Sequence, residues 1–230
     1  MRDLAEPTAA RLPRWRGFNL QEKFSPATNG RFREEDFATI AGWGLDFVRL
    51  PMDYRLWSDE ADPYALHEPA LAEIDEAVAL GWTPVEGIVD LGVAQSMHAY
   101  DPWAVSHWRA PWFTGAETWP EPTWPLRTDD GVLDKAALLD RRIGMWKRLE
   151  ARGVGVHVGE FGTYSETPHA VTLAWMRDWL DLLDDAGWGW AIWNLRGSYG
   201  PLDSGRADAE HEDLNGHRLD RAMLDLILRQ

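Results

Sequence analysis

Residues 153–162 read GVGVHVGEFG, a short apolar run that ends in one carboxylate, Glu160. Valines and glycines in a run of this length are typical of a buried strand. A carboxylate at the end of such a strand needs a charge partner or a chemical role, because an unpaired buried charge is costly. The stretch therefore predicts a strand over 153–160 that delivers Glu160 to a functional site.

Further along the chain in both directions, short apolar runs alternate with amphipathic segments. We expect strands over 15–20, 46–51, 92–98 and 188–194, and helices over 33–44, 68–81, 133–153, 167–187 and 217–228. Alternating strands and helices favour a parallel sheet covered by helices. For 230 residues the leading architecture is a single domain, 1–230, of the triosephosphate isomerase barrel type.

The composition narrows the class of function. A net charge of −15 argues against nucleic acid, and the absence of cysteine excludes thiolate metal sites. The histidines show no helical ligand pair and no phosphate loop is present, so we expect neither metal nor cofactor. Fifteen tryptophans indicate aromatic platforms suited to sugars. The N-terminal residues carry no secretory or membrane signal, which predicts a cytoplasmic protein unless a leader has been trimmed.

Polar side chains occupy the ends of the predicted strands, which is where a barrel of this type places its active site. They are Asn19 with the nearby Glu22, then Arg49, His98, Tyr100, Glu160 and Trp193. Taken singly, each has a structural interpretation: His98 and Trp193 suit a core, and Arg49 and Glu160 suit an ion pair. Together they suit one chemistry, in which a held, ionised carboxylate acts as a nucleophile.

Six stretches carry a resemblance to a known family. They are RGFNLQEKF, DFVRLPMDYRLW, SMHAYDPWAVSHW, VHVGEFGTY, GWGWAIWNLRGSYGPLDSGR and DLNGHRLDRAMLDLI. In these stretches the chain resembles glycoside hydrolase family 5, the cellulase family of retaining β-glycosidases. The resemblance implies hydrolysis of a β-linked glucan or related polysaccharide.

The resemblance also implies a role for each residue. Glu160 would be the nucleophile, with Arg49, His98 and Tyr100 as its catalytic neighbours. The residues expected to bind the sugar are Trp193, Asn19, Glu22 and Trp108, the last in a loop rich in tryptophan.

The chain departs from the family at one point. The resemblance implies a full eight-stranded barrel whose fourth strand carries an Asn-Glu pair, and the glutamate of that pair is the general acid/base. None of the four asparagines of this chain precedes a glutamate. The third to fifth strand–helix units are missing, with a possible internal deletion near 81–92. We therefore expect about five strands, equivalent to the first, second, sixth, seventh and eighth of the family.

The missing acid leaves the chemistry open. Glu22, Glu86, Asp90, Glu117 and Glu121 are carboxylates that could replace it, and Glu86 is the weak candidate to test first. The function predicted is a retaining β-glycosidase with impaired activity on natural substrates. The alternatives are a glycan-binding protein without catalysis and an inactive remnant.

The missing units also leave the fold open, because removing them exposes two strand edges. The remaining strands could close on themselves, two chains could pair through the edges as a homodimer, or the chain could aggregate.

Overall fold

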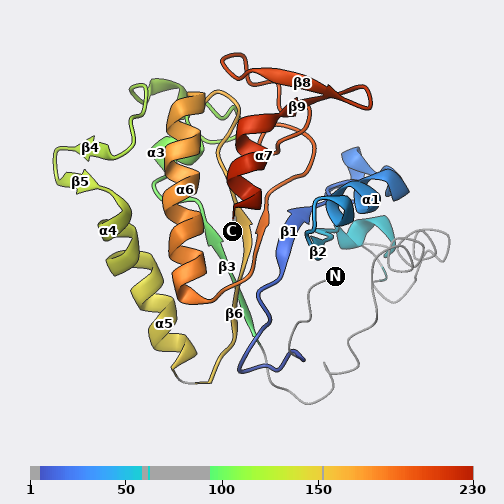
Figure 1. The fold of residues 1–230 in the computed structure, drawn as a ribbon, viewed down its shortest axis with the longest axis horizontal. Helices are drawn as coiled ribbons and strands as arrows, with labels where there is room; N and C mark the ends of the chain where they lie inside the picture. The colour runs from blue at the N-terminus through green and yellow to red at the C-terminus, as the bar shows by residue number, and fades with distance from the viewer. Residues whose placement is uncertain (1–5, 59–61, 63–93, 152, 230) are drawn as a thin grey trace.

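The computed structural model describes residues 6–58, 62, 94–151 and 153–229. The predicted helix over 68–81 and the possible deletion near 81–92 lie outside the described residues. The centre of the fold is one parallel sheet (Figure 1). Its strands are β1 (Arg16–Asn19), β2 (Phe47–Arg49), β3 (Gln95–Ala99), β6 (Val156–Phe161) and β7 (Trp190–Ile192).

All five predicted strands are confirmed, with ends shifted by up to three residues. The order across the sheet is β2-β1-β7-β6-β3. In a barrel that keeps only its first, second, sixth, seventh and eighth strands, the remaining neighbours follow this same order. Within the described residues β2 and β3 pair with one strand each, so the sheet is an open arc of a triosephosphate isomerase-type barrel.

Helices cover the arc. The longest, α6 (His169–Ala186), begins after Pro168 and ends at Gly187 in the left-handed conformation, and it buries both Trp175 and Trp179. α6 packs beside α7 (Arg221–Leu228) in front of the sheet (Figure 1). The other helical segments are α1 (Glu34–Gly42), α3 (Trp103–Ser106), α4 (Lys135–Leu138), a π-turn (Leu139–Ile143), α5 (Gly144–Glu150) and the 3-10 turns Pro26–Thr28, Tyr54–Leu56 and Ala116–Thr118.

The predicted helix over 217–228 is wrong in its first turn. Residues His217–Asp220 form β9, which pairs with β8 (His211–Leu214), and the helix begins only at Arg221. Asn215 and Gly216 between the two strands both have positive φ, the geometry that an Asn-Gly hairpin turn needs. A second hairpin, β4 (Leu126–Thr128) with β5 (Gly131–Leu133), follows the tryptophan-rich loop.

Among the described helices, none combines the length and apolar character needed to cross a membrane.

Candidate active site

The functional side chains meet at the carboxyl edge of the sheet. Asn19 and Arg49 are the last residues of β1 and β2, and Trp193 directly follows β7. Glu160 is the penultimate residue of β6, beside His98 in β3. Because all five strands are parallel, their carboxyl ends lie at one edge, and residues far apart in sequence become neighbours.

A bulge at Gly159 sets the height of the carboxylate. Met97 pairs with Val158, but the next pair is His98 with Glu160, so β6 carries one extra residue there. A Cβ on Gly159 would lie 2.2 Å from Oγ of Ser96, so a larger residue here would require the Ser96 side chain to move. The bulge therefore places Glu160 opposite His98, where a regular ladder would place Gly159.

Three side chains contact the carboxylate of Glu160. Nη1 of Arg49 donates to Oε1 at 2.8 Å, and Nε2 of His98 lies 3.2 Å from the same oxygen. The phenol of Tyr100 donates to Oε2 at 3.2 Å. The side chain of Glu160 is 11% exposed, so it is held on both oxygens yet still reaches the surface.

The neighbours of Glu160 keep their neutral or charged forms for identifiable reasons. Burial lowers the pKa of His98, as does Arg49, against the opposing effect of Glu160, so the imidazole is neutral at pH 7. Burial, reinforced by the Glu160 charge, raises the pKa of Tyr100, which keeps the phenol a hydrogen-bond donor. The site therefore combines one carboxylate, one guanidinium, one neutral phenol that donates a hydrogen bond and one neutral imidazole.

Asn19 links the strands that carry the site. Its Nδ2 donates to the carbonyl oxygens of Gly159 at 2.9 Å and Ile192 at 2.8 Å, and its Oδ1 accepts from Arg49 at 2.8 Å. The residue is fully buried. Every polar atom of the Asn19 side chain is thus engaged in tying β1 to β2, β6 and β7, while its expected role in substrate binding stays a prediction.

Trp193 lies at the edge of the site and is partly exposed. Its indole meets the ring of Phe24 edge-on, with ring centroids 5.1 Å apart. Phe24 in turn lines a groove of about 540 Å³ that also contains Arg49. The full lining is Phe24, Arg49, Pro51, Met52, Asp53, Tyr54 and Arg55. Phe24 and Tyr54, 47% and 58% exposed, are groove residues that the sequence analysis did not identify.

Glu22 lines a different cavity. This cavity, of about 200 Å³, is lined by Asn19, Leu20, Gln21, Glu22, Asp36, Asn194, Leu195 and Arg196. Burial raises the pKa of Glu22, and its Oε2 has no hydrogen-bond partner among the described residues. Neither Glu160 nor Trp193 lines this cavity, and Asn19 is the residue that it shares with the contacts around Glu160.

Trp108 is also placed differently from expectation. It is 5% exposed, its Nε1 donates to the carbonyl oxygen of Trp119 at 3.1 Å, and the guanidinium of Arg109 lies 4.4 Å from its ring centroid. These contacts leave little of the indole for a sugar. The exposed tryptophans of this region are Trp103 and Trp112, 43% and 57% exposed.

The described carboxylates that could replace the general acid/base differ in their surroundings. Asp53 lines the groove with Arg49, but hydrogen bonds from Arg55 lower its pKa to about 2, so it holds no proton at neutral pH. Glu117 and Glu121 are exposed, and Glu86 and Asp90 lie outside the described residues. Across the described ranges, no group of three or more His, Asp or Glu side chains is arranged to hold a metal ion.

Comparison with solved structures supports the fold. A structure described as a glycoside hydrolase superposes with a TM-score of 0.79 at 21% identity, covering 94% of this chain and 99% of that one. Thermotoga maritima Cel5A, solved with cellobiose, gives 0.75 at 13% identity, covering 93% and 97%. Cellulose synthase subunit Z from Clostridioides difficile gives 0.65 at 16% identity, covering 93% and 99%.

Sequence comparison supports the family. None of the curated proteins compared with the chain matches it. The family model for cellulase, glycosyl hydrolase family 5, matches residues 83–198, which is just over half of the chain and includes His98, Tyr100, Glu160 and Trp193. The chain therefore belongs to glycosyl hydrolase family 5, the cellulase family.

Proposed function

We propose that the protein is a retaining β-glycosidase acting on β-linked glucan or a related polysaccharide, with Glu160 as nucleophile and with impaired turnover of natural substrates. The observation that carries this proposal is the carboxylate of Glu160, held by Arg49 at 2.8 Å and by Tyr100 at 3.2 Å. A carboxylate that is ionised, oriented and still accessible suits attack on an anomeric carbon.

The proposed reaction has two steps. An oxygen of Glu160 forms a bond to the anomeric carbon while the bond from that carbon to the leaving-group oxygen breaks, and the electron pair leaves with that oxygen. In the second step the oxygen of a water molecule forms a bond to the anomeric carbon while the bond from that carbon to the Glu160 oxygen breaks. The water loses one proton to the solvent, and Glu160 is released as a carboxylate. Arg49 offsets the charge of the free carboxylate between turnovers, and His98 is placed to hydrogen-bond a sugar hydroxyl.

The first step lacks a proton donor for the leaving group. The sequence has no Asn-Glu pair, and Asp53, the other carboxylate near Arg49, stays ionised. A sugar alkoxide leaves slowly without a proton, and losing general acid catalysis costs about 10²–10⁴-fold in rate. An aryl oxide with a low pKa needs no proton. We therefore infer activity on activated aryl glycosides and weak activity on glucans.

The groove beside Arg49 supports a glycan as the ligand. Its volume lies in the range of ligand sites, and exposed rings of Phe24 and Tyr54 offer flat faces to sugar C–H groups. Its charged side chains are paired, Arg49 with Glu160 and Arg55 with Asp53. Paired charges favour a neutral sugar chain over one that carries uronic acids.

Covalent labelling tests the proposal. The protein is incubated with a 2-deoxy-2-fluoro β-cellobioside carrying a dinitrophenyl leaving group, followed by intact mass and peptide mapping. This reagent supplies its own good leaving group, so it isolates the nucleophile from the missing acid. We expect a glycosyl adduct on the peptide containing Glu160, and none in Glu160→Gln. An unlabelled wild-type sample that is demonstrably folded would overturn the proposal.

A glycan-binding protein without catalysis is the second candidate. The aromatic groove and the missing acid favour it, and it predicts saturable binding of a cello-oligosaccharide by calorimetry with no adduct. The third candidate is an inactive remnant, which predicts neither glycan binding nor an adduct. Cooperative unfolding of a monodisperse sample would count against this candidate.

We also propose that the protein can form a homodimer and that it is located in the cytoplasm. The described strands β2 and β3 each pair on one side only, which is the basis for pairing between two copies. Light scattering after size exclusion gives the oligomeric state directly. Cell fractionation gives the location.

A further inference from the structure

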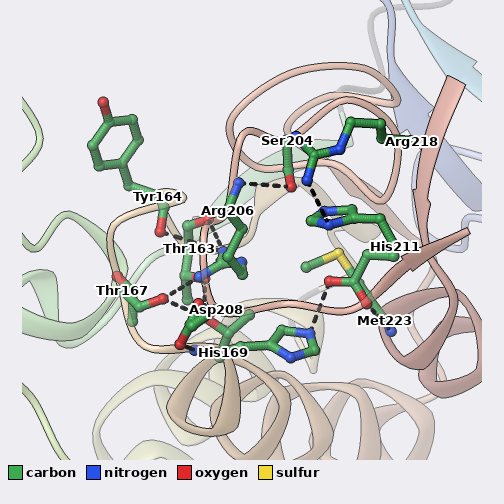
Figure 2. A network of polar contacts seen from close by, with 12 residues as sticks. Thr163, Tyr164, Thr167, His169, Ser204, Arg206, Asp208, His211, Arg218 and Met223 are labelled. Carbon is green, nitrogen blue, oxygen red and sulfur yellow. Dashed lines mark hydrogen bonds and ion pairs between the residues drawn. The ribbon is translucent and has the colours of Figure 1, made fainter.

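Arg206 is the one buried arginine of the C-terminal loop region shown in Figure 2, and it is 0% exposed. It follows β7 by fourteen residues in a segment that runs back over the loop after the nucleophile strand. Burial lowers its pKa to about 10, with Asp208, Asp220 and Glu166 opposing that effect, so it stays charged at neutral pH. A buried charge of this kind must be held by specific partners.

The partners of the guanidinium are backbone carbonyls of the loop over residues 162–167, which we call the 162–167 loop. Nη1 donates to the carbonyl oxygen of Thr167. Nη2 is within 3.3–3.4 Å of the carbonyl oxygens of Thr163 and Tyr164 and of the Thr163 hydroxyl. Figure 2 shows the guanidinium pointing into the curve of this loop. One planar donor group thus fixes both ends of the loop.

The opposite side of the 162–167 loop is bound to the segment that carries Tyr100. The amide of Tyr164 donates to the carbonyl oxygen of Ser106 at 2.8 Å, and the hydroxyl of Thr167 donates to that of Val105 at 2.7 Å. The hydroxyl of Ser106 then donates to the carbonyl oxygen of Tyr100 at 2.5 Å. The loop therefore connects to Glu160 along the chain and to its hydrogen-bond donor Tyr100 across space.

We propose that Arg206 is a positioning residue that holds Glu160 and Tyr100 in register by clamping the 162–167 loop between the C-terminal segment and residues 105–106. Its kinetic consequence rests on the proposed function, because it concerns the reactivity of Glu160. Arg206 touches neither the carboxylate nor the groove. Loss of Arg206 therefore lowers the rate at which Glu160 attacks the sugar and leaves the affinity for the sugar unchanged.

Inactivation kinetics with the fluorinated cellobioside separate these two quantities. In Arg206→Met we expect the maximal rate constant of labelling to fall about tenfold or more, with the half-saturating concentration within about twofold of wild type, because small misplacements of a nucleophile are costly in rate. Arg206→Lys keeps the charge and part of the donors, and we expect an intermediate rate. Arg221→Met is the matched control: it removes an arginine of the same region that is exposed and pairs with Glu212, and we expect no change.

Ser106→Ala tests the same route at another point. It breaks the bond to the Tyr100 carbonyl without touching Arg206, so it also covers the case in which Arg206→Met does not fold. We expect its labelling rate to fall with unchanged binding. If Ser106→Ala and Arg206→Lys both label at the wild-type rate, the clamp has no influence on Glu160 and the proposal is wrong.

A crystal structure of Arg206→Lys or Ser106→Ala tests the positioning role of Arg206 even if the wild-type protein is not labelled. We expect the distance between the Tyr100 hydroxyl and Oε2 of Glu160, 3.2 Å in the wild type, to exceed about 3.5 Å. An unchanged distance in both variants would overturn the positioning role. Failure of wild-type labelling would overturn the proposed function alone.

Discussion

The phenol of Tyr100 donates to Oε2 of Glu160 at 3.2 Å, while the other carboxylate oxygen faces Arg49 and His98. The two oxygens therefore have different surroundings: one faces a cationic partner and the other a single neutral donor. This asymmetry fixes the rotation of the carboxylate about its last bond. It also makes Tyr100 the residue whose removal changes orientation without removing charge.

Tyr100→Phe should lower the rate of labelling by the fluorinated cellobioside about tenfold while the protein stays folded. A hydrogen bond to a charged group contributes about 1.5–3 kcal/mol, and the phenylalanine ring preserves the packing against His107 and Tyr199. Mass spectrometry of samples quenched at successive times gives the rate of labelling. Thermal unfolding checks that the variant is folded. A rate equal to wild type would mean that Arg49 and His98 orient the carboxylate without Tyr100.

Turnover should depend steeply on the leaving group. Without a proton donor, the departing oxygen carries its full charge, so aryl β-cellobiosides should react progressively more slowly as the pKa of the phenol rises. A series from dinitrophenol to unsubstituted phenol, measured by absorbance, gives the slope. A flat series in kcat/KM would show that the leaving group receives a proton, and Glu86→Gln would then be the first variant to measure.

Tyr54→Ala should weaken binding of longer oligosaccharides while leaving labelling by a fluorinated monosaccharide unchanged. Tyr54 is 58% exposed in the groove beside Arg49, whereas the side chains that hold Glu160 are Arg49, His98 and Tyr100. Stacking of an aromatic ring contributes about 0.5–1.5 kcal/mol, so the dissociation constant of a cello-oligosaccharide should rise about tenfold at most. Calorimetry measures it, and Val132→Ala, exposed in the β4–β5 hairpin, is a control. Equal affinities in both variants would remove Tyr54 from the glycan site.

The stability of the fold should fall as the pH is lowered from about 6.5 to 4. His157 packs against Trp15 and Phe47, and its burial, together with the charge of Arg49, lowers its pKa to about 4 despite a hydrogen bond with the Trp15 backbone. Between these pH values the unfolded chain binds a proton that the native imidazole refuses. The contribution of His157 is present above about pH 6.5 and lost as the pH falls to 4, by up to about 3 kcal/mol.

Urea unfolding at several pH values measures this loss. His157→Gln removes the titrating group, so its free energy of unfolding should depend less on pH than that of wild type. Some dependence should persist, because burial also lowers the pKa of His107 to about 4. An unchanged slope in His157→Gln would mean that the imidazole is protonated in the folded protein.

Much of the site could be predicted because it depends on strand ends. Short apolar runs located the five strands, and parallel strands bring the residues at their carboxyl ends to one edge whatever their separation in sequence. Arg49, His98, Tyr100 and Glu160 are expected at one edge for this reason, and the structure shows the expected contacts of Arg49 and Tyr100 with Glu160. The approach of His98 to Glu160 was not expected. The positions of the apolar runs and the absence of an Asn-Glu pair can both be read from the sequence without knowledge of any side-chain contact.

The errors concern features that depend on local geometry or on burial. The helix over 217–228 was predicted too long because the turn at Asn215 and Gly216, a recognisable hairpin signal, was not weighed against helical periodicity. The bulge at Gly159 leaves its carbonyl to be bound by Asn19, and no period-two pattern reveals that. Trp108 shares its loop with exposed tryptophans, and sequence alone does not say which indole turns inward.

The open arc has a consequence for how the chain could be rebuilt. β2 and β3 are consecutive among the described strands, yet they stand at opposite ends of the sheet and do not pair with each other. Strand–helix units inserted between them would extend the arc from its two ends and leave all four existing pairings intact. Three strand–helix units from a relative with the Asn-Glu pair could therefore be inserted between β2 and β3. Such a graft would supply a second carboxylate opposite Glu160.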